Sequence, residues 1–345
     1  MTLRGMRREL TNVSFPVIDF HCDVLSKMRE DHGLSFKDGA QLDVTYDRML
    51  EGEVMLQCFA MYLPESWGIP RYEFILDQID AFKTRVMRTG EGVRWLKWKE
   101  DAEELGQTIG TAASGRSRHL PWGLLSVEGA DGFEGNLYYV RMCYELGVRF
   151  LGITWNYANW AADGVLEQRN GGFTEKGKKL IELANETGLL LDVSHLSETG
   201  FWELAERTAR PFIASHSNAK SVCAHPRNLN DDQIRAIIAM NGRIGLTFVP
   251  WFVRDGGEGA VKPEELLRHI EHICALGGDD HLMLGSDFDG IDSWIEGLEH
   301  PGKYPAFAEL LSRHFPEASV RKWFSGNALS FLTSHLPERD NANAG

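Results

Sequence analysis

Eight short hydrophobic runs recur along the 345-residue chain, and turn-forming residues separate each run from the next. The runs span residues 16–23, 53–63, 122–131, 149–156, 189–196, 211–217, 243–250 and 281–290. Most of them are nearly continuous rather than alternating, which is typical of parallel strands that are covered on both faces of their sheet. The sequence therefore predicts eight buried strands of a parallel sheet.

Helical patterns lie between these runs. In TEKGKKLIELANETG, Thr174 suits the N-cap of a helix and Gly188 suits the position just after its end. In KPEELLRHIEHICALG, Pro263 stands in the first turn and apolar residues follow at helical spacing. Parallel strands need crossover connections, and eight strand–helix units close around a filled interior. We therefore predict an α/β fold, specifically a (β/α)8 TIM-like barrel.

The predicted barrel forms a single domain over residues 16–335, with additional helices at its C-terminal end. Residues 1–15 are expected to form an N-terminal lead segment, and residues 336–345 a frayed tail. The stretch 64–121 is longer than one crossover needs. It is expected to hold a loop and two helices, at about 71–89 and 97–107.

The balance of charge excludes some classes of partner. Fifty acidic and 36 basic residues give a formal net charge of −14, and the basic residues form no long run, so neither nucleic acid nor an anionic membrane is an expected partner. No stretch approaches about 18 uninterrupted apolar residues, and the first sixteen residues lack the apolar core of a secretory signal. We expect a cytoplasmic protein with small-molecule partners. The five scattered cysteines are expected to be buried free thiols.

Seven polar residues stand at or just beyond the C-terminal ends of predicted strands. They are His21, Asp23, Glu128, His195, His216, Asp287 and Asp289. Because the C-terminal ends of barrel strands converge on one face, where active sites of this fold lie, these residues are expected to meet. Taken singly, a strand-end histidine is more often a structural residue, and the H-x-D pair can be a hydrogen-bonded polar pair at the barrel mouth. Together they are hard to explain by packing, since a buried charge costs several kcal/mol unless it is paired or bound to a metal.

The group as a whole predicts a metal site. His21 and Asp23 are two positions apart in an extended segment, so both side chains point to one side and can bind one ion through nitrogen and oxygen. Two ions are favoured over one, because Glu128 can give one oxygen to each while His195 and His216 complete the second set. Mixed nitrogen and carboxylate ligands suit Zn²⁺, and ligand types alone leave Mn²⁺ and Co²⁺ open as substitutes.

Five motifs stand in order along the chain: FHCD, SVEGAD, DVSH, SHSNAKSVCAHPRN and GSDFDG. This ordered set resembles the membrane (renal) dipeptidase family of dinuclear zinc peptidases, over about residues 16–330. The resemblance implies a (β/α)8 barrel that hydrolyses dipeptides, including those with a C-terminal D-residue. Since the sequence shows neither a secretory signal nor a hydrophobic C-terminal tail, it resembles the soluble bacterial type. A homodimer is expected from the resemblance alone.

The resemblance also implies a role for each motif residue. The metal ligands that it implies are His21 and Asp23 for one zinc ion, His195 and His216 for the other, and Glu128 as the bridging carboxylate. Asp287, in GSDFDG, matches the catalytic acid/base residue. Asp289 is expected to be a structural partner instead.

Two further positions concern the substrate. Arg227, in HPRN, matches the arginine that holds the free carboxylate of a dipeptide; the alternative is a loop arginine paired with Asp231 or Asp232. Trp155, in GITWN, stands where animal members carry a substrate-contacting histidine. Its indole can form a pocket wall and donate a hydrogen bond, but it cannot act as an acid or a base. This departure bears on the substrate preference.

The predicted reaction is hydrolysis of the peptide bond of a dipeptide by a water that bridges two zinc ions, with Asp287 and Glu128 as catalytic residues. The main alternative is another dinuclear-metal amidohydrolase, acting on N-acyl amino acids or cyclic amides. Many such barrels bridge their metals with a carboxylated lysine on the fourth strand, and RFLGITWN contains no lysine. A catalytically silent, metal-stabilised binding protein is the second alternative.

Overall fold

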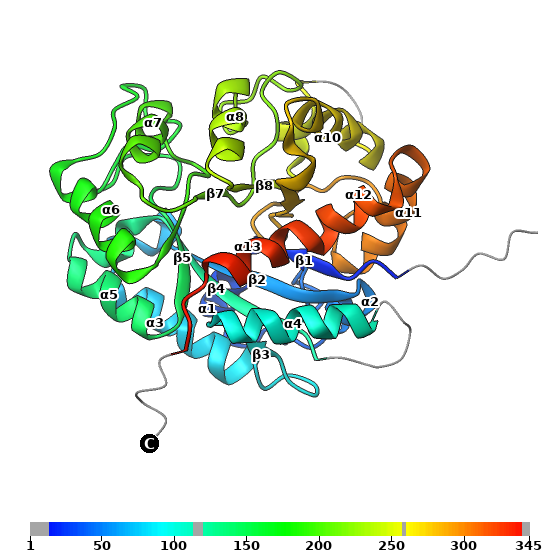
Figure 1. Cartoon of the computed structure of the whole chain (residues 1–345). Helices are drawn as coiled ribbons and strands as arrows, with labels where there is room; N and C mark the ends of the chain where they lie inside the picture. The colour runs from blue at the N-terminus through cyan, green and yellow to red at the C-terminus, as the bar shows by residue number, and fades with distance from the viewer. Residues whose placement is uncertain (1–13, 113–119, 257–259, 340–345) are drawn as a thin grey trace, which may run out of the picture.

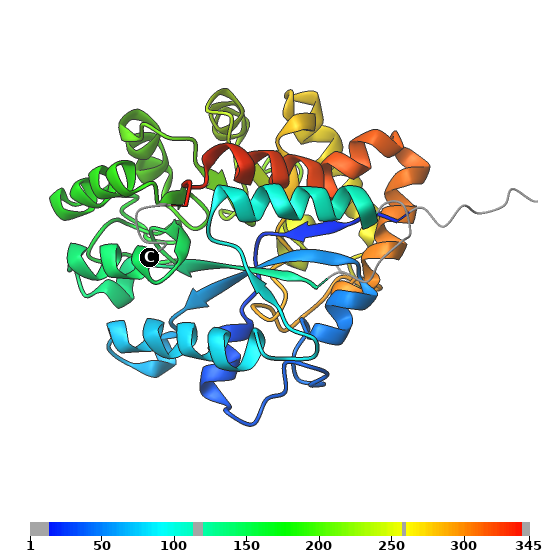
Figure 2. The ribbon, with the colours of Figure 1, turned by 60° about the horizontal axis from the view of Figure 1, so that its bottom comes forward.

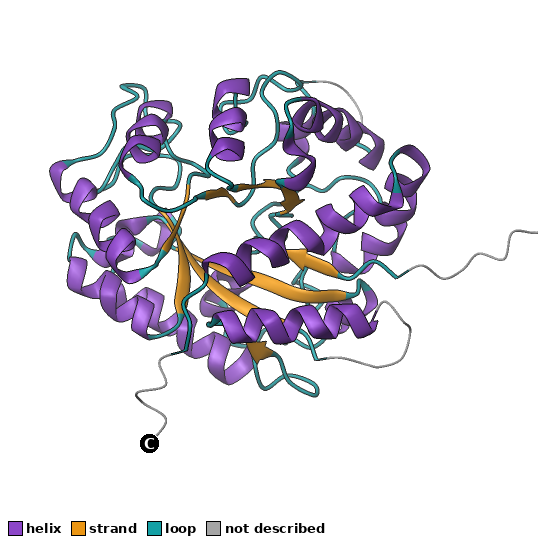
Figure 3. Ribbon diagram, viewed as in Figure 1, coloured by secondary structure: helices purple, strands orange, loops and turns teal. Residues whose placement is uncertain are grey.

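Nine parallel strands follow one another around a closed sheet in the computed structural model, which describes residues 14–112, 120–256 and 260–339 (Figure 1). They are β1 (Val17–Asp19), β2 (Val54–Tyr62), β3 (Arg94–Trp95), β4 (Trp122–Glu128), β5 (Val148–Gly152), β6 (Leu190–Asp192), β7 (Ile213–Ala214), β8 (Arg243–Leu246) and β9 (Leu282–Leu284). Their order is β2-β1-β9-β8-β7-β6-β5-β4-β3, and a further pairing between β2 and β4 closes a barrel of eight strands. The predicted TIM-like barrel is confirmed, and Figure 3 shows its strands within a layer of helices.

The eight predicted strands correspond to β1, β2 and β4–β9. β3 is an addition that the hydrophobic pattern does not predict, since it lies between the two helices expected in the long crossover. Its two residues pair with the start of β4, where Arg94 is opposite Trp122. The guanidinium of Arg94 also lies 3.8 Å from the centre of the Trp122 ring, so this short strand extends the wall of the barrel at its base.

Helices alternate with the strands and surround them. They are α1 (Val24–Glu30), α2 (Tyr46–Glu51), α3 (Tyr72–Ala81), α4 (Lys99–Ala112), α5 (Leu137–Glu145), α6 (Glu175–Thr187), α7 (Glu198–Arg207), α8 (Asp231–Ala239), α9 (Pro250–Val253), α10 (Leu266–Ala275), α11 (Tyr304–His314), α12 (Glu317–Arg321) and α13 (Asn327–His335). Single wide turns extend two of them: η2 (Phe82–Val86) continues α3, and η7 (Lys322–Gly326) joins α12 to α13. The two helices predicted in the long crossover are α3 with η2, and α4.

The capping residues define where helices begin and end. Thr174 Oγ1 accepts a hydrogen bond from the Gly177 amide at 3.0 Å, as an N-cap does. Gly188 ends α6 with a φ of +86°, which a residue without a Cβ adopts at little cost. Both predictions for this helix are confirmed. Pro263 lies in a short turn that leads directly into α10, as its position predicts.

Buried apolar residues form two large clusters, one on each face of the barrel wall. The outer cluster fills the space between the strands and the surrounding helices. The inner cluster includes Ile18, Leu124 and Phe150 from the strands, together with Leu105 of α4 and Phe331 of α13. α4 and α13 lie side by side across the N-terminal ends of the strands (Figures 1 and 2). This end of the barrel is therefore closed by apolar packing, and polar chemistry is left to the opposite end.

The frayed tail predicted for residues 336–345 is packed over its first four residues. The carbonyl of Pro337 accepts a hydrogen bond from the first residue of α4, at 2.8 Å. Arg339 forms an ion pair with Asp101, with 2.7 Å between Nη2 and Oδ1. These contacts hold residues 337 and 339 on the barrel floor, so this part of the predicted tail is not frayed; residues 340–345 lie outside the described residues.

Ser14 and Phe15, which end the predicted lead segment, are also attached to the barrel. Ser14 Oγ donates to Glu53 at 2.5 Å, and Phe15 is buried, whereas the rest of the lead segment lies outside the described residues. All five cysteines are free thiols, as predicted, and four of them are buried as expected, whereas Cys274 is partly exposed. Among the helices that the structure describes, none has both the length and the apolar character needed to cross a membrane.

Candidate active site

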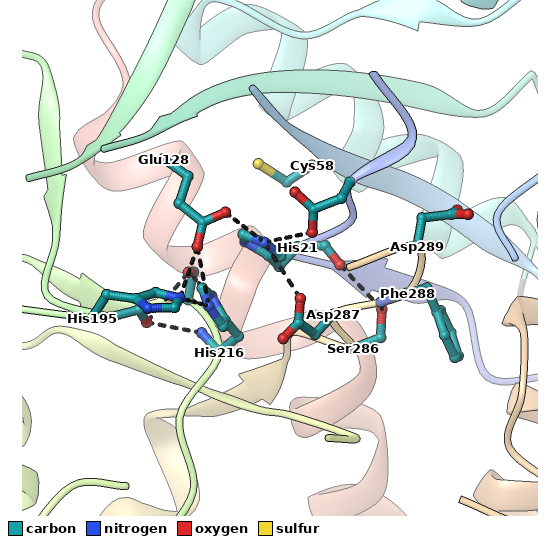
Figure 4. A network of polar contacts seen from close by, with 12 residues as sticks. His21, Cys58, Glu128, His195, His216, Ser286, Asp287, Phe288 and Asp289 are labelled. Atoms are coloured by element: carbon teal, nitrogen blue, oxygen red, sulfur yellow. Dashed lines mark hydrogen bonds and ion pairs between the residues drawn. The ribbon is translucent and has the colours of Figure 1, made fainter. Parts of the chain in front are cut away.

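Polar side chains gather where the C-terminal ends of the strands meet (Figure 4). They come from the ends of β1, β4, β6, β7 and β9. The structure brings together six of the seven strand-end residues that the sequence singles out: His21, Asp23, Glu128, His195, His216 and Asp287. Two subsets, His21 with Glu128 and His216, and His21 with Asp23 and Asp287, have ligand atoms within 4.8 Å of one another.

The first set of side chains, here called the acid-rich group, consists of His21, Asp23 and Asp287. Nε2 of His21 lies 3.3 Å from Asp23 Oδ2 and 3.7 Å from Asp287 Oδ1. His21 and Asp23 are only 3% and 5% exposed. Within the described residues, neither His21 Nε2 nor Asp23 Oδ1 has a hydrogen-bond partner. Buried polar atoms without partners are costly, and a cation bound here would satisfy both.

Burial and charge together determine the pKa values of the acid-rich group. Burial lowers the pKa of His21, but the negative charges of Glu128 and Asp23 outweigh burial and hold that pKa well above 6.5. Burial raises the pKa of Asp287 to about 8; the charge of His21 opposes this rise, and those of Asp23 and Glu128 add to it. Without a metal, the acid-rich group therefore retains protons at neutral pH that a cation would displace.

The second set, here called the imidazole pair, consists of His195 and His216. Their Nε2 atoms lie 3.0 Å apart, and they lie 2.8 Å and 3.5 Å from Glu128 Oε1. Both rings are buried. Burial is the main cause that lowers the pKa of His195 to about 4 and that of His216 well below 6.5. Both rings are therefore neutral at pH 7, which is the form that binds a metal.

Neighbouring side chains determine which nitrogen of each ring carries the proton. Nδ1 of His195 lies 2.8 Å from the side-chain oxygen of Asn156, an acceptor, so Nδ1 is the donor. Nδ1 of His216 lies 2.7 Å from Ser215 Oγ, whose own hydroxyl donates to Asp192, so this ring also donates through Nδ1. Both Nε2 atoms are left with lone pairs directed at each other and at Glu128. The two lone pairs and the carboxylate of Glu128 repel one another, and a cation bound between them would remove this repulsion.

These orienting residues are not among those predicted from the sequence. Ser215 directly precedes His216, and Asn156 directly follows Trp155, so proximity to a site residue was the available signal. Asp192 offers another signal, because it is an acid inside an otherwise apolar strand. Its Oδ1 accepts hydrogen bonds from the amides of Ser194 and Ser215, both at 2.9 Å, and these bonds fix the backbone beside both histidines.

Glu128, the last residue of β4, lies between the two sets (Figure 4). Its Oε2 is 3.4 Å from Nε2 of His21, and its Oε1 is 2.8 Å from Nε2 of His195. The side chain is buried. Burial alone would raise its pKa, but the positive charge of His21 opposes burial and helps to hold the pKa well below 4.5, so the carboxylate is ionised. Each of its two oxygens therefore faces a different set of ligands.

A buried network beneath the acid-rich group joins the first and last strands of the barrel. Asp19 Oδ1 accepts from the Ser286 amide at 2.9 Å, and Oδ2 accepts from the hydroxyls of Ser286 and Tyr304 at 2.6 Å and 2.8 Å. The Asp287 amide donates to the carbonyl of His21 at 3.3 Å. These contacts fix the segment that carries Asp287 against the end of β1. The sequence analysis singles out neither Asp19 nor Tyr304.

Three of the seven strand-end residues stand on left-handed backbone. His195, Asp287 and Asp289 have φ values of +69°, +70° and +68°. Non-glycine residues rarely adopt this conformation, and strained positions of this kind concentrate at functional sites. At His195 and Asp287 the turn directs the side chain into the site (Figure 4).

Asp289 has a different environment. Its carboxylate accepts from Lys27 Nζ at 3.0 Å and from the amides of Asp43 and Val44 at 2.8 Å and 2.9 Å. In Figure 4 it lies apart from the histidines. Asp289 therefore holds the loop before α2, in agreement with the structural role that the sequence suggests.

Arg227 lines a cavity of about 390 Å³ that opens onto Glu128 and Asp287. The residue is 4% exposed, and its guanidinium donates to the carbonyl of His216 at 3.2 Å and lies 5.3 Å from the ring centre of Phe252. Its Nε has no hydrogen-bond partner within the described residues. Burial lowers its pKa to about 10, so the group is still cationic at neutral pH. A carboxylate that enters the cavity would meet a buried positive charge.

The alternative pairing of Arg227 with Asp231 or Asp232 does not occur. Asp231 pairs with His272 at 2.7 Å, and Asp232 with Arg235 at 3.0 Å. Among the described carboxylates, none lies within ion-pair distance of Arg227.

Trp155, in the loop after β5, forms part of the wall of the same cavity. Its ring centre lies 5.1 Å from that of Tyr62 and 6.0 Å from that of His195. An aromatic surface therefore borders the imidazole pair.

Comparison with known proteins identifies the family. A family model described as membrane dipeptidase (peptidase family M19) matches residues 7–340, nearly the whole chain. The chain belongs to this family. The family resemblance carried by the five sequence motifs is thereby confirmed.

Three curated relatives show how the family extends. A protein of Klebsiella pneumoniae, described as an uncharacterized protein in the pqqA 5′ region, is 40% identical over 173 residues, which cover 48% of this chain and 64% of that protein. The uncharacterized dipeptidase C965.12 of Schizosaccharomyces pombe is 28% identical over 284 residues, covering 78% and 66%. Dipeptidase 3 of Mus musculus is 28% identical over 328 residues, covering 91% and 63%. The chain thus spans slightly less than two thirds of the length of these relatives.

Solved structures of metallopeptidases share the fold. A structure described as the metallopeptidase dipeptidase AC has a TM-score of 0.81 and 26% identity, covering 93% of this chain and 99% of that one. A metallopeptidase from Rhodobacter sphaeroides, liganded with a phosphinate mimic of the dipeptide L-Ala-D-Ala, has a TM-score of 0.81 and 25% identity, covering 94% and 99%.

The donor atoms of this M19 chain fit divalent cations. The acid-rich group offers an imidazole nitrogen and carboxylate oxygens that lack partners, and the imidazole pair offers two lone pairs with no proton between them. Nitrogen and carboxylate ligands in a buried site are typical of transition-metal centres in enzymes. The residues are therefore a candidate metal site with two ligand sets and one shared carboxylate.

Proposed function

We propose that this protein is a dinuclear metallopeptidase that hydrolyses the peptide bond of dipeptides, including those with a C-terminal D-residue. The observation that carries the proposal is the position of Glu128, which offers one oxygen to each of two buried ligand sets at the side of a cavity lined by a buried arginine. The structural neighbour from Rhodobacter sphaeroides, a metallopeptidase liganded with a phosphinate mimic of L-Ala-D-Ala, supports the choice of substrate.

The proposed cofactors are two Zn²⁺ ions, with Mn²⁺ or Co²⁺ as substitutes. His21, Asp23 and Glu128 would hold one ion, and His195, His216 and Glu128 the other. When bound, such ions lower the pKa of a coordinated water and polarise the scissile carbonyl.

Asp287 is the proposed acid/base residue. Its carboxylate takes a proton from the attacking water as the water oxygen bonds to the carbonyl carbon. It then delivers that proton to the amine nitrogen as the C–N bond breaks. The hydrogen bond from its amide to the carbonyl of His21 keeps the segment in place during both transfers. One carboxylate therefore serves first as a base and then as an acid.

Arg227 is the proposed binding residue for the substrate carboxylate. Two parallel hydrogen bonds from a guanidinium fix both the position and the orientation of a carboxylate. Arg227 donates a hydrogen bond to the carbonyl of His216, which belongs to the imidazole pair. The barrel therefore fixes the distance between Arg227 and the reacting centre. A carboxylate held there places the adjacent peptide bond at Glu128, which favours dipeptides over longer peptides.

Replacing Arg227 tests this assignment. We expect Arg227→Ala to raise KM for dipeptides about 30- to 100-fold with a smaller change in kcat, because a charge-assisted contact of about 2–3 kcal/mol is lost. Arg227→Lys keeps the charge but not the planar pair of donors, so its KM should lie between that of the unaltered protein and that of Arg227→Ala. Unchanged KM values in Arg227→Ala would rule out this role.

The reaction class is tested by removing the metal with a chelator and returning Zn²⁺, Mn²⁺ or Co²⁺. The reloaded protein is then incubated with L,L-, L,D- and D,L-dipeptides, tripeptides and N-acyl amino acids. We expect metal-dependent hydrolysis of L,L- and L,D-dipeptides. Hydrolysis of N-acyl amino acids alone would favour the broader amidohydrolase function, and tight metal binding with no hydrolysis would indicate a binding protein. A cytoplasmic location and a homodimer stay predictions of the sequence.

A further inference from the structure

A second cavity adjoins the first at Trp155. It also measures about 390 Å³, and the two cavities share Tyr62, Pro64, Glu128 and Trp155. Beyond these shared residues, the second cavity is bordered by the segment after β2 and by the loop after β5. We call it the aromatic lobe, after Tyr62, Trp155 and Tyr157 in its wall.

The order of the strands places the aromatic lobe opposite Arg227. Arg227 stands in the loop after β7, and four steps around the barrel in either direction lead from β7 to β2. The lobe begins at Tyr62, the last residue of β2. Glu128, on the neighbouring strand β4, borders both cavities. A dipeptide with its carboxylate at Arg227 and its peptide bond at Glu128 therefore extends its N-terminal residue toward the lobe.

The walls of the lobe are mainly apolar. The rings of Tyr62 and Trp155 lie 5.1 Å apart, and those of Trp155 and Tyr157 lie 6.5 Å apart. Ile69 and Tyr157, which also border the lobe, are 75% and 52% exposed. A large apolar side chain in the lobe would cover these surfaces and gain the free energy of removing them from water.

Two acids complete the lining. Glu65 is exposed, and the carboxylate of Asp131 accepts a hydrogen bond from Asn159 at 3.1 Å. Their charge, added to that of Glu128, opposes an acidic side chain in the lobe.

We infer that the aromatic lobe selects dipeptides whose N-terminal residue carries a large apolar or aromatic side chain, and that Trp155 and Tyr157 determine this preference. The inference rests on the proposed function and goes further, since it names the substrate class. It assigns no preference to the C-terminal side chain.

The test uses the metal-loaded protein and two series of substrates, X-Ala and Ala-X, in which X is Phe, Leu, Ala, Lys or Glu. We expect kcat/KM for Phe-Ala to exceed that for Ala-Ala by on the order of tenfold or more, mainly through KM, because a buried aromatic side chain adds binding energy. Glu-Ala should be the poorest of the X-Ala series. Phosphinate mimics of Phe-Ala and Ala-Ala should show the same order of Kd by calorimetry.

Two variants test whether Trp155 and Tyr157 determine the preference for a large N-terminal side chain. Trp155→Ala and Tyr157→Ala should each reduce the ratio of kcat/KM for Phe-Ala to that for Ala-Ala toward one, while the ratio of Ala-Phe to Ala-Ala keeps its value. Tyr138→Ala is the matched control, because Tyr138 is 59% exposed on α5 and borders neither cavity. It should leave both ratios as they are.

Turnover of Ala-Ala without preference for Phe-Ala would overturn the inference, and so would preference for Lys-Ala or Glu-Ala. A change of equal size in both series for Trp155→Ala would also overturn it. Failure to hydrolyse any dipeptide would instead contradict the proposed function, and the order of Kd values for the two mimics would still decide whether the lobe prefers an aromatic side chain.

Discussion

The acid-rich group and the imidazole pair lie on either side of Glu128 but are built in different ways. In the imidazole pair, Asn156 and Ser215 hold the proton of each ring on Nδ1, and burial keeps both rings neutral. In the acid-rich group, the nitrogen of His21 faces three carboxylates and has no hydrogen-bond partner in the described part of the chain. One set is thus prepared for a cation by its hydrogen bonds, whereas the other changes its protonation when a cation binds. Mutations in the acid-rich group, in the imidazole pair or at Glu128 between them can test this difference.

The largest effect is expected from Glu128→Gln, which breaks the link between the two sets. Glutamine keeps the volume of the side chain but removes the charge that faces both sides. We expect the loss of at least one metal ion per chain and a fall in kcat/KM on the order of 10⁴-fold, because both ligand sets lose their shared anion. Metal analysis and dipeptide kinetics would measure this. Two retained ions with more than a tenth of the activity would contradict a bridging role.

Asp287→Asn asks whether the chemical step belongs to the acid-rich group. Asparagine tolerates the left-handed backbone at this position, so the fold should be kept. We expect kcat to fall about 10²- to 10⁴-fold with both metals retained, because a general acid/base is removed.

The matched control is Asp289→Asn, which makes the same change two residues further on at nearly the same φ. There we expect a lower Tm, since charge-assisted bonds from Lys27 and two amides weaken, with a much smaller effect on kcat. Equal losses of kcat in the two variants would show that Asp287 acts only through the structure of its loop.

Ser215→Ala tests the preparation of the imidazole pair. Without the Ser215 hydroxyl, His216 loses the acceptor that fixes its proton on Nδ1. We expect the affinity for one of the two ions to fall about 10- to 100-fold, as is usual when a residue that orients a metal ligand is removed. Titration of the metal-free protein with Zn²⁺ would measure both affinities, with Ser221→Ala, an exposed serine that pairs with Asp231, as the control. Equal affinities in the variant and the unaltered protein would exclude an orienting role.

The smallest effect concerns pH. The pKa of His21 is raised well above 6.5, so the ring is protonated at pH 7 and must lose its proton to bind a metal. The affinity of the acid-rich group should therefore rise with pH, by up to about tenfold per pH unit for each proton released. The pKa of His195 is about 4, so that ring is already neutral above about pH 5, and the affinity of the imidazole pair should stay nearly constant from pH 6 to 8.

Calorimetry at pH 7 in buffers of different ionisation enthalpy would count the protons released on metal binding. We expect His21→Gln to reduce the release, because the ring proton of His21 is no longer there, and His195→Gln to leave the release unchanged. Equal proton release from the two variants would contradict the expectation that the acid-rich group releases protons on metal binding and the imidazole pair does not.

The fold and the positions of the site residues could both be predicted from the sequence, because the same hydrophobic runs indicate the strands and the places where the strands end. A nearly continuous apolar run marks a strand buried on both faces, and a polar residue at its end then marks the mouth of the barrel. His21, Glu128, His195 and His216 all follow this rule.

The same pattern overstates the length of the strands. The run 281–290 contains only three residues of β9, Leu282–Leu284, because the backbone then leaves the sheet and turns at Asp287. Hydrophobicity reports burial, whereas a strand is defined by hydrogen bonding to its neighbours. For the same reason β3, only two residues long and half-buried, leaves no signal in the pattern.

The orienting residues were not predictable in this way. Tyr304 reaches Asp19 across 285 positions, and Asp192 reaches Ser215 across 23. A hydrogen-bond partner is chosen by position in the folded chain, and a single sequence gives no measure of that position. Arg339 and Asp101 pair on the barrel floor in the same way, and the sequence pattern gives no sign of this contact.

The junction between β1 and β9 also bears on how the protein is made. The amide of Asp23 donates to the carbonyl of Phe288 at 3.0 Å, and Asp19 pairs with Leu284, so the two ends of the barrel meet beneath the acid-rich group. A ribosome releases His21 long before it releases Asp287. The nascent chain can thus display His195 and His216 well before that junction exists, and capture of a cation at the acid-rich group would mark the moment when the circle of strands is complete.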